Sequence, residues 1–336
     1  MNAAHGMAGN HADESSVALL TGATGTVGAA LLERLLADGR RVRCMVRNAR
    51  QLRAHPRLDA VAGDIEDAAV VDRAVRGCTT VFHVAGVPQQ WTADPSIYVR
   101  SNVDGTRHVL DAALRHGARR FVYASTQDTL DQTLDPFDET SVNRDPRPSP
   151  YEQSKILAQR LVDAAAASGL HTCSLHLVAV FGASPRRIGG INALVHGIAT
   201  GSVPMLPPGG LPLLYDHDAA DAFARAEAMA APGSRYLVSD RYVAVAELAQ
   251  RVCRVTGRDM PRSMPLWMAE LFAGLGDGVA SLTRRPPMLS RVDMRAFTHP
   301  GRPSNARIRA DLAWKPTDLD EALGETIAAW SERPQS

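Results

Sequence analysis

The chain has 336 residues, of which 45% are hydrophobic and 22% are charged, and its formal net charge is +1. A chain of this length can bury a large core, as one elaborated domain or two closely associated ones. The near-zero net charge gives no electrostatic case for nucleic acid or an anionic membrane, and no apolar run is long enough to span a bilayer. We therefore expect neither nucleic acid nor a membrane among its partners.

The N-terminal residues and the cysteines bear on the compartment. Residues 1–16 are small and polar and lack the basic and apolar segments of a secretory signal, so we expect a disordered tail. The four cysteines form no close pairs, which fits reduced thiols in a cytoplasm, and the eleven histidines are scattered. The sequence predicts a cytoplasmic protein without a metal site.

From residue 17 onward, short β-type runs alternate with amphipathic helical patterns. Such alternation is typical of crossover units and predicts an α/β fold with a doubly wound parallel sheet. Glycines at 39, 117 and 169 stand where helices should end, because glycine is the favoured left-handed cap. The candidate strands are 17–20, 41–46, 58–61, 80–84 and 120–124, and the candidate helices are 27–38, 68–76, 97–116 and 151–167.

The first candidate strand runs into a glycine-rich turn. Thr21 is followed by glycines at 22, 25 and 28 and then by a helix-forming run. The glycines let the backbone turn sharply and approach a ligand, and the N–H groups and positive dipole end of the helix suit a pyrophosphate. An ordinary glycine-rich loop is the alternative, and the residues downstream favour a dinucleotide site.

The ends of the next strands supply further candidate cofactor contacts. At the second strand end an acidic residue would bind ribose hydroxyls, whereas Arg47 suits a 2′-phosphate, which favours NADP(H) over NAD(H). An arginine that meets only solvent is the alternative. Asp64 and Ile65 follow the third strand, where a polar contact to the adenine edge is expected. Ala85 follows the fourth strand, where a small residue lets the chain pass close to the cofactor.

Tyr151 and Lys155 are the candidate acid/base pair. Their spacing of four places both side chains on one face of a helix. A nearby ammonium favours the tyrosinate, so we expect Lys155 to lower the pKa of Tyr151. The fifth strand ends in Ser125 and Thr126, whose hydroxyls lie at the same sheet edge. A surface tyrosine and lysine in a chance pattern is the alternative for the pair taken alone.

Taken together, these motifs resemble those of the extended short-chain dehydrogenases/reductases. The resemblance runs almost from end to end and is carried by segments 21–28, 63–65, 83–86, 102–106, 121–126 and 151–155. It implies a Rossmann-type sheet with a smaller C-terminal substrate-binding region. Thr126 would orient the substrate oxygen, Tyr151 would transfer the proton, and Lys155 would tune Tyr151 and bind the nicotinamide ribose. The resemblance also implies that the pyrophosphate is held by Gly22, Thr24, Gly25, Thr26, Val27 and Gly28.

Segments 46–48 and 81–85 resemble the dihydroflavonol reductase and 3β-hydroxysteroid dehydrogenase branch of the NAD-dependent epimerase/dehydratase superfamily. The resemblance implies a dinucleotide-binding domain over 17–182, with contributions from 211–240, and a mainly substrate-binding region over 183–332. Relatives often pair through two helices, so it also implies a homodimer through 97–116 and 151–167.

Three loops after the fourth, fifth and sixth strands are expected to face the substrate. They mix apolar side chains with a few polar ones, which suits a small-molecule substrate of middle size and largely apolar character. A loop-closing role is the alternative for Gln127 and Asp128, and a solvated arginine is the alternative for Arg186. The candidate substrate contacts are Gln89, Trp91, Gln127, Asp128 and Arg186.

The mostly apolar segment 265–283 is predicted to be a helix, interrupted by three glycines. Its large side chains, Trp267 among them, could form a hydrophobic lid over the substrate. A core helix and a dimer surface are the alternatives.

The sequence therefore predicts an NADP(H)-dependent oxidoreductase that moves a hydride between the nicotinamide and a ketone or secondary alcohol. An epimerase or dehydratase that acts on a sugar or nucleotide-sugar and retains its cofactor is the first alternative. A non-catalytic NADP-binding sensor is the second.

Overall fold

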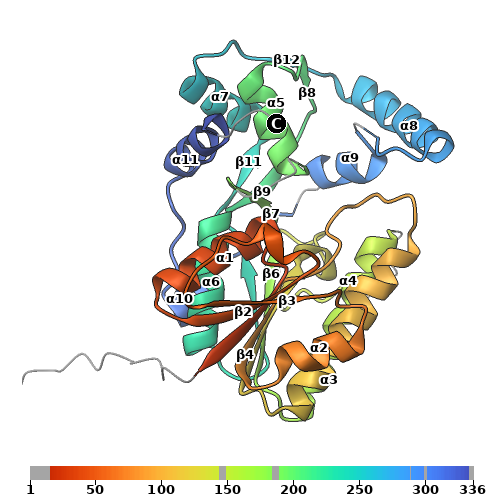
Figure 1. Ribbon diagram of the computed structural model, residues 1–336. Helices are drawn as coiled ribbons and strands as arrows, with labels where there is room; N and C mark the ends of the chain where they lie inside the picture. Colours follow the sequence, from red (N-terminus) through yellow and green to blue (C-terminus); the bar gives the residue numbers. More distant parts are fainter. Residues whose placement is uncertain (1–15, 144–148, 184–188, 288, 299–300, 333–336) are drawn as a thin grey trace, which may run out of the picture.

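The computed structural model describes residues 16–143, 149–183, 189–287, 289–298 and 301–332 (Figure 1). Residues 1–15 of the expected tail and Arg186 lie outside the described residues.

A seven-stranded parallel sheet forms the lower half of the molecule in Figure 1. Its strand order is β10-β6-β5-β4-β1-β2-β3, which contains the 3-2-1-4-5-6 order of a Rossmann fold. The predicted doubly wound fold is confirmed, and the five predicted strands lie where expected to within two residues. The strands are β1 (Val17–Thr21), β2 (Arg41–Val46), β3 (Leu58–Ala62), β4 (Cys78–His83), β5 (Arg120–Thr126), β6 (Thr172–Leu177) and β10 (Ser234–Val238).

Helices cover both faces of this sheet (Figure 1). On one face α1 (Thr26–Ala37) packs against α6 (Asp216–Met229), and α6 contacts α10 (Ala306–Leu312). On the other face lie α2 (Ala68–Val75), α3 (Gly105–Arg115) and α4 (Pro150–Ala167). Each face has its own apolar core, as expected for parallel strands buried on both sides.

The predicted helix over 97–116 is not a single α-helix. Residues Tyr98–Asp104 form a π-helix, and α3 begins only at Gly105. A Cβ at position 105 would lie 2.8 Å from Ile65 Cδ1, so any residue other than glycine would require the Ile65 side chain to move. The wide turn holds Asn102, whose side chain bonds the backbone of Val87 rather than its own helix. Such π-turns recur near functional sites, where a side chain is turned toward a neighbouring loop.

The upper part of the molecule is built around a second, three-stranded sheet of order β11-β9-β7. The proline and glycine content of segment 201–214 suggests irregular structure, but the segment contains β8 and most of β9. Strand β9 forms because β11 and β7 pair with it on its two sides. The elements are β7 (Ala179–Phe181), β8 (Met205–Leu206), β9 (Gly210–Tyr215), β11 (Arg241–Ala244), β12 (Arg262–Ser263), α5 (Ile191–Thr200), α7 (Val245–Thr256), α8 (Leu266–Thr283), α9 (Arg291–Thr298) and α11 (Leu319–Ser331).

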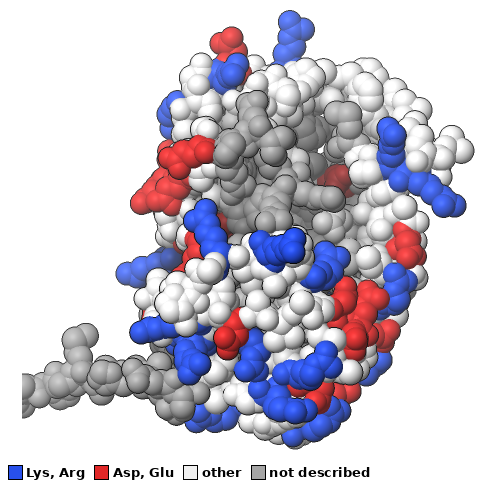
Figure 2. Space-filling model, viewed as in Figure 1, with Lys and Arg blue, Asp and Glu red and all other residues white. Residues whose placement is uncertain are grey.

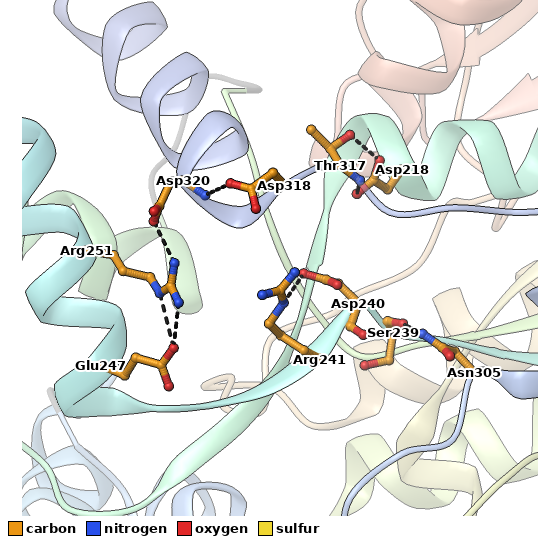
Figure 3. A network of polar contacts seen from close by, with 10 residues as sticks. All are labelled: Asp218, Ser239, Asp240, Arg241, Glu247, Arg251, Asn305, Thr317, Asp318 and Asp320. Carbon is orange, nitrogen blue, oxygen red and sulfur yellow. Dashed lines mark hydrogen bonds and ion pairs between the residues drawn. The ribbon is translucent and has the colours of Figure 1, made fainter.

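A polar network ties the last segments of the chain to the rest (Figure 3). Thr317 donates to the buried carboxylate of Asp218 on α6, and Asn305 donates to the backbone oxygens of Ser239 and Asp240. Arg251 on α7 bridges Glu247 and Asp320, which joins α7 to α11. These contacts fix the C-terminal segment across both parts of the molecule.

Candidate active site

The candidate site lies at the carboxyl ends of the central strands. β1 and β4 are neighbours in the sheet, and the chain leaves β1 toward β2 and β4 toward β5 on the other side. Open parallel sheets bind ligands at such a switch point. The glycine turn follows β1, Ala85 follows β4, and Thr126 ends β5, so the topology brings the predicted motifs to one edge.

The glycine turn has the close backbone approach that a pyrophosphate cradle needs. Gly22 has φ +78°, and a Cβ there would lie 2.7 Å from Ala85 N. A Cβ at Gly28 would lie 2.0 Å from Gly22 O, so α1 starts against the turn itself. Gly25 is the N-cap of α1, and Thr26 and Val27 follow it in the first turn. No acidic side chain in this turn would repel a phosphate. Thr24 is half-buried in the turn. The residues present fit a dinucleotide phosphate at this helix N-terminus.

A buried histidine that was not singled out from the sequence locks the turn to β4. His83 Nδ1 lies 2.8 Å from Thr21 Oγ1 and its Nε2 lies 3.0 Å from Thr106 Oγ1. Thr21 Oγ1 also accepts from Ala85 N at 3.2 Å. Burial and the charge of Lys155 lower the His83 pKa to about 3, so the ring is neutral at pH 7. His83 therefore serves the turn as a structural hydrogen-bonding group.

The adenosine-side candidates lie at the ends of β2 and β3. Arg47 is exposed and makes no hydrogen bond or ion pair with any residue that the structure describes. Its guanidinium is therefore available for a phosphate. Asp64 caps a turn through Glu66 N, and its side chain is half-buried. Ile65 is buried, packs against Gly105, and accepts at its backbone oxygen from His108.

Tyr151 and Lys155 occupy the first turns of α4, where Pro150 and a Ser149–Glu152 capping box fix the helix start. Both side chains are buried. Lys155 Nζ donates to Tyr123 OH and to Ala124 O, each at 2.8 Å. The ring of Tyr98 packs edge-on against Tyr151, with ring centroids 6.0 Å apart. The helix thus presents a buried phenol and a buried amine at the end of β5.

The expected lowering of the Tyr151 pKa by Lys155 is wrong for this structure. Burial raises the pKa of Tyr151, and the charge of Asp128 adds to this. Lys155 does not offset the effect, because its amine bonds Tyr123 and Ala124 instead, and burial lowers its own pKa to about 7. The prediction considered only the charge of the ammonium. Burial, which disfavours the charged form of both side chains, is the larger effect.

Thr126 and Asp128 form one polar unit after β5. Thr126 Oγ1 donates to Asp128 Oδ2 at 3.1 Å and accepts from Asp128 N at 3.3 Å. Gln90 and Gln132 each donate a side-chain amide to the same carboxylate. The short helix Gln127–Thr129 places Asp128 beside the Thr126 hydroxyl. Gln127 is half-buried, and its Oε1 has no partner among the described residues.

Asn102 is hydrogen-bonded to α4, the helix that carries Tyr151 and Lys155. Its Nδ2 donates to Ser154 Oγ at 3.0 Å, and Ser154 donates to Tyr151 O at 2.7 Å. Its Oδ1 accepts from Val87 N, in the loop that follows β4. The π-turn, the β4 loop and α4 are therefore linked through one amide.

The remaining substrate candidates lie in the β4 loop, apart from Arg186, which is outside the described residues. Gln89 is exposed and accepts at its backbone oxygen from Tyr98 OH. Trp91 is half-buried and borders an open hollow of about 340 Å³, whose other walls include Asp277, Ala280 and Arg284 near the end of α8. This hollow lies between the β4 loop and α8.

Besides His83, one contact of the site was not predicted from the sequence. Tyr123, the hydrogen-bond partner of Lys155, lies 32 residues before it, and only the register of β5 against α4 brings them together. The predicted residue Lys155 carries a further sequence signal, because Lys155 and Lys315 are the only lysines of the chain, although Lys and Arg total 37. Almost all cationic residues of this chain are arginines, so a lysine indicates a position that needs lysine in particular. Unlike arginine, a buried lysine can lose its proton.

The Rossmann sheet, with a Tyr–Lys helix beside its fifth strand, defines an extended short-chain dehydrogenase/reductase. The family model described as the NAD dependent epimerase/dehydratase family matches residues 18–238, and the chain belongs to this family.

Three similar proteins illustrate the range of the family. Sterol demethylase protein B of Methylococcus capsulatus is 26% identical over 333 residues, which cover 94% of this chain and 98% of the relative. The 3 beta-hydroxysteroid dehydrogenase/Delta 5→4-isomerase of Mycobacterium tuberculosis is 31% identical over 262 residues, covering 73% and 70%. The solved UDP-glucose 4-epimerase of Thermus thermophilus, in complex with NAD, superposes with a TM-score of 0.75 at 23% identity, covering 94% and 99%. The last likeness shows the fold alone.

Proposed function

We propose that the chain is an NADP(H)-dependent oxidoreductase acting on a ketone or secondary alcohol of a largely apolar substrate. The observation that carries the proposal is the buried Tyr151 and Lys155 on one helix face, beside a Thr126 hydroxyl at the end of β5. Dehydrogenation of an alcohol needs a group that takes the hydroxyl proton. Tyr151 is the titratable side chain that we assign to this role, because it lies at the start of α4, beside the end of β5. The steroid chemistry in the names of two relatives supports a bulky apolar substrate.

The chain's own residues would divide the work as follows. The nicotinamide, when bound, supplies hydride transfer. The glycine turn binds the pyrophosphate, Lys155 orients the ribose, and Tyr151 exchanges the proton with the substrate oxygen. Because the Thr126 hydrogen points at Asp128, Thr126 offers a lone pair, which suits an alcohol hydroxyl as its donor.

For ketone reduction, which needs the protonated phenol of Tyr151, replacing Asp128 with asparagine is expected to move the basic limb of the pH–rate profile to lower pH. The charge of Asp128 raises the pKa of Tyr151, so removing that charge favours the tyrosinate. The profile of kcat/KM between pH 6 and pH 10 is the measurement. Gln132→Leu is the matched control, because it removes one amide from Asp128 and leaves the charge in place. A limb that stays at the same pH in Asp128→Asn would separate Asp128 from the proton transfer.

Replacing Arg47 with aspartate is expected to shift cofactor preference from NADPH toward NADH. A guanidinium binds a 2′-phosphate, whereas a carboxylate repels it and can accept from the ribose hydroxyls. The change in the ratio of dissociation constants should be about 10-fold or more, which corresponds to roughly 1.4 kcal/mol. Arg50→Asp, an exposed neighbour on the short helix Ala49–Gln51, is the control. An unchanged ratio in Arg47→Asp would mean that Arg47 meets only solvent.

The assay that tests the proposed function follows nicotinamide absorbance against a panel of ketones and alcohols that includes steroids, flavonoids and β-keto compounds. Net NADPH oxidation with a bulky apolar ketone, or the reverse reaction with its alcohol, is the expected result. Conversion of a sugar nucleotide to an isomer or a dehydrated product without net cofactor change would instead assign the chain to the epimerase/dehydratase activity. Tight cofactor binding without turnover on the panel would favour a sensor.

A further inference from the structure

Helix α8 exposes its large apolar side chains and buries its small ones. The buried residues Ala269, Ala273 and Ala280 share one stripe, because they are spaced by four and seven residues. The opposite face consists of large apolar side chains, and Leu282 is 86% exposed. Seven of the exposed large apolar side chains belong to α8: Leu266, Trp267, Leu271, Phe272, Leu275, Val279 and Leu282.

The attachment of α8 to the rest of the protein is narrow. Its alanine stripe packs against Met294 of α9, with Met264 and Leu289 beside it. Gly276 allows a close approach, since a Cβ there would lie 2.6 Å from Leu289 O. The helix therefore sits at the edge of the molecule, at the upper right in Figure 1. Trp267, Leu271 and Phe272, expected to belong to a lid, are exposed, and the lid stays a prediction.

The charge around α8 differs from that of the whole chain. Segment 262–302 contains six arginines and three acidic residues, in a chain whose net charge is only +1. Two of these arginines, Arg295 and Arg302, form ion pairs with Glu152 and Asp135 outside the segment. Arg284 and Arg285 directly follow the helix, are exposed, and make no ion pair among the residues described. Figure 2 shows mostly uncharged atoms over this end of the molecule, with basic side chains beside them.

We propose that α8 lies on the surface of an anionic lipid bilayer, with the exposed apolar face inserted at the headgroup level. An apolar face with a tryptophan near one end and arginines at the other is the pattern of an interfacial helix. None of the helices in the described part of the chain is long and apolar enough to cross a bilayer, which agrees with a helix that lies on it. The expectation of no membrane partner rested on the overall net charge, which hides this local excess.

A second copy of the chain fits the face less well than lipid. In a two-fold interface each position of the patch meets a different position of the other copy, and segment 262–302 has six arginines but only three acidic residues, so a second copy would offer Arg284 and Arg285 few carboxylate partners. An anionic bilayer offers the opposite charge, and each arginine near such a surface contributes about 1 kcal/mol. An anionic bilayer can therefore both bury the apolar side chains of α8 and attract the neighbouring arginines.

Helix α8 borders the same hollow as Trp91, a candidate substrate contact. The hollow of about 340 Å³ lies between the last two turns of α8 and the β4 loop segment that contains Trp91 and Pro95. Substrate dissolved in lipid would thus enter beside the inserted face. This entry route rests on the proposed function, whereas the docking itself does not.

Vesicle flotation of the full chain tests the docking. Vesicles of phosphatidylcholine alone are compared with vesicles containing one-third phosphatidylglycerol, at low and high salt. We expect the protein to float with the anionic vesicles, to do so at least 10-fold less with the neutral ones, and to be released by salt. Trp267 fluorescence should shift to shorter wavelength on binding, and Trp267→Phe should lack that shift.

The variant Leu271→Ser/Leu275→Ser/Val279→Ser is expected to lose at least 10-fold in vesicle binding. Its circular dichroism and its activity on a water-soluble substrate should stay unchanged, because the three side chains point away from the core. Leu114→Ser/Leu157→Ser/Val255→Ser, which removes exposed apolar side chains from α3, α4 and α7, is the matched control and should bind like the wild type.

Three results would overturn the proposal. The first is failure of the wild type to float with anionic vesicles, and the second is equal flotation of the triple α8 variant. The third is a dimer in sedimentation velocity that the triple α8 variant converts to a monomer, which would show that a second copy covers the face. Since flotation needs neither cofactor nor turnover, an inactive enzyme that floats would refute the proposed function and leave the docking intact.

Discussion

Tyr151→Phe is expected to lower kcat by about 10²–10⁴-fold, the range that a positioned acid or base contributes. The substitution removes only the hydroxyl of a buried side chain, and the ring contact with Tyr98 stays in place. NADPH affinity should therefore remain within about twofold of wild type, which is well under 1 kcal/mol. Turnover under saturating cofactor and cofactor titration by fluorescence give the two numbers.

Tyr98→Phe is the matched control for this prediction. Tyr98 is also buried and lies against Tyr151, but its hydroxyl donates to the backbone oxygen of Gln89. Loss of that hydrogen bond should cost about 1 kcal/mol of stability and leave most of the turnover. Equal turnover in wild type and Tyr151→Phe, or equal losses in Tyr151→Phe and Tyr98→Phe, would remove Tyr151 from the proton transfer.

The parallel sheet was predictable because its signals are local. β1 to β5 are short apolar runs separated by helical patterns, and glycines such as Gly39 and Gly117 mark where the helices end. The glycine turn was predictable for the same reason, since the positive φ of Gly22 and the contact at Gly28 permit no larger side chain. The candidate site followed from strand order, because parallel strands bring their carboxyl ends to one edge.

The features that were missed depend on contacts between distant segments. The partner of Lys155 is Tyr123, and the two meet only through the packing of α4 on β5. Strand β9 contains Pro212, yet it pairs with β11 and β7 because two neighbours outweigh a weak local preference. The outward face of α8 was also unpredictable, since an apolar helix without a polar face reads equally as core.

Lys155→Met is expected to abolish most of the activity and, without cofactor, to stabilise the protein. The Lys155 amine is buried, and its hydrogen-bond partners are neutral, Tyr123 OH and Ala124 O. Burial lowers its pKa from 10.5 to about 7, and each unit of such a shift corresponds to about 1.36 kcal/mol of folding free energy. Part of the gain is offset because methionine leaves the two acceptors without the amine, at about 1 kcal/mol each. We expect a net stabilisation of about 1–3 kcal/mol at pH 7.

The pH dependence of this difference gives the sharper test. Between pH 7 and pH 10.5 the unfolded chain holds a proton on Lys155 that the folded protein has released, so the stability of the wild type rises with pH in this window. The cost of burying the amine is fully present below pH 7 and disappears above 10.5. The advantage of Lys155→Met should therefore shrink as denaturant unfolding is repeated from pH 7 to pH 9.5.

Lys315→Met supplies the matched control, because Lys315 is the other lysine of the chain and is exposed. It should change neither the activity nor the slope of stability against pH. A Lys155→Met variant that is less stable than wild type at pH 7, or whose stability difference is constant with pH, would show that the Lys155 amine is not strained by burial. Lost activity together with raised stability would instead identify Lys155 as a group kept for the reaction at the expense of the fold.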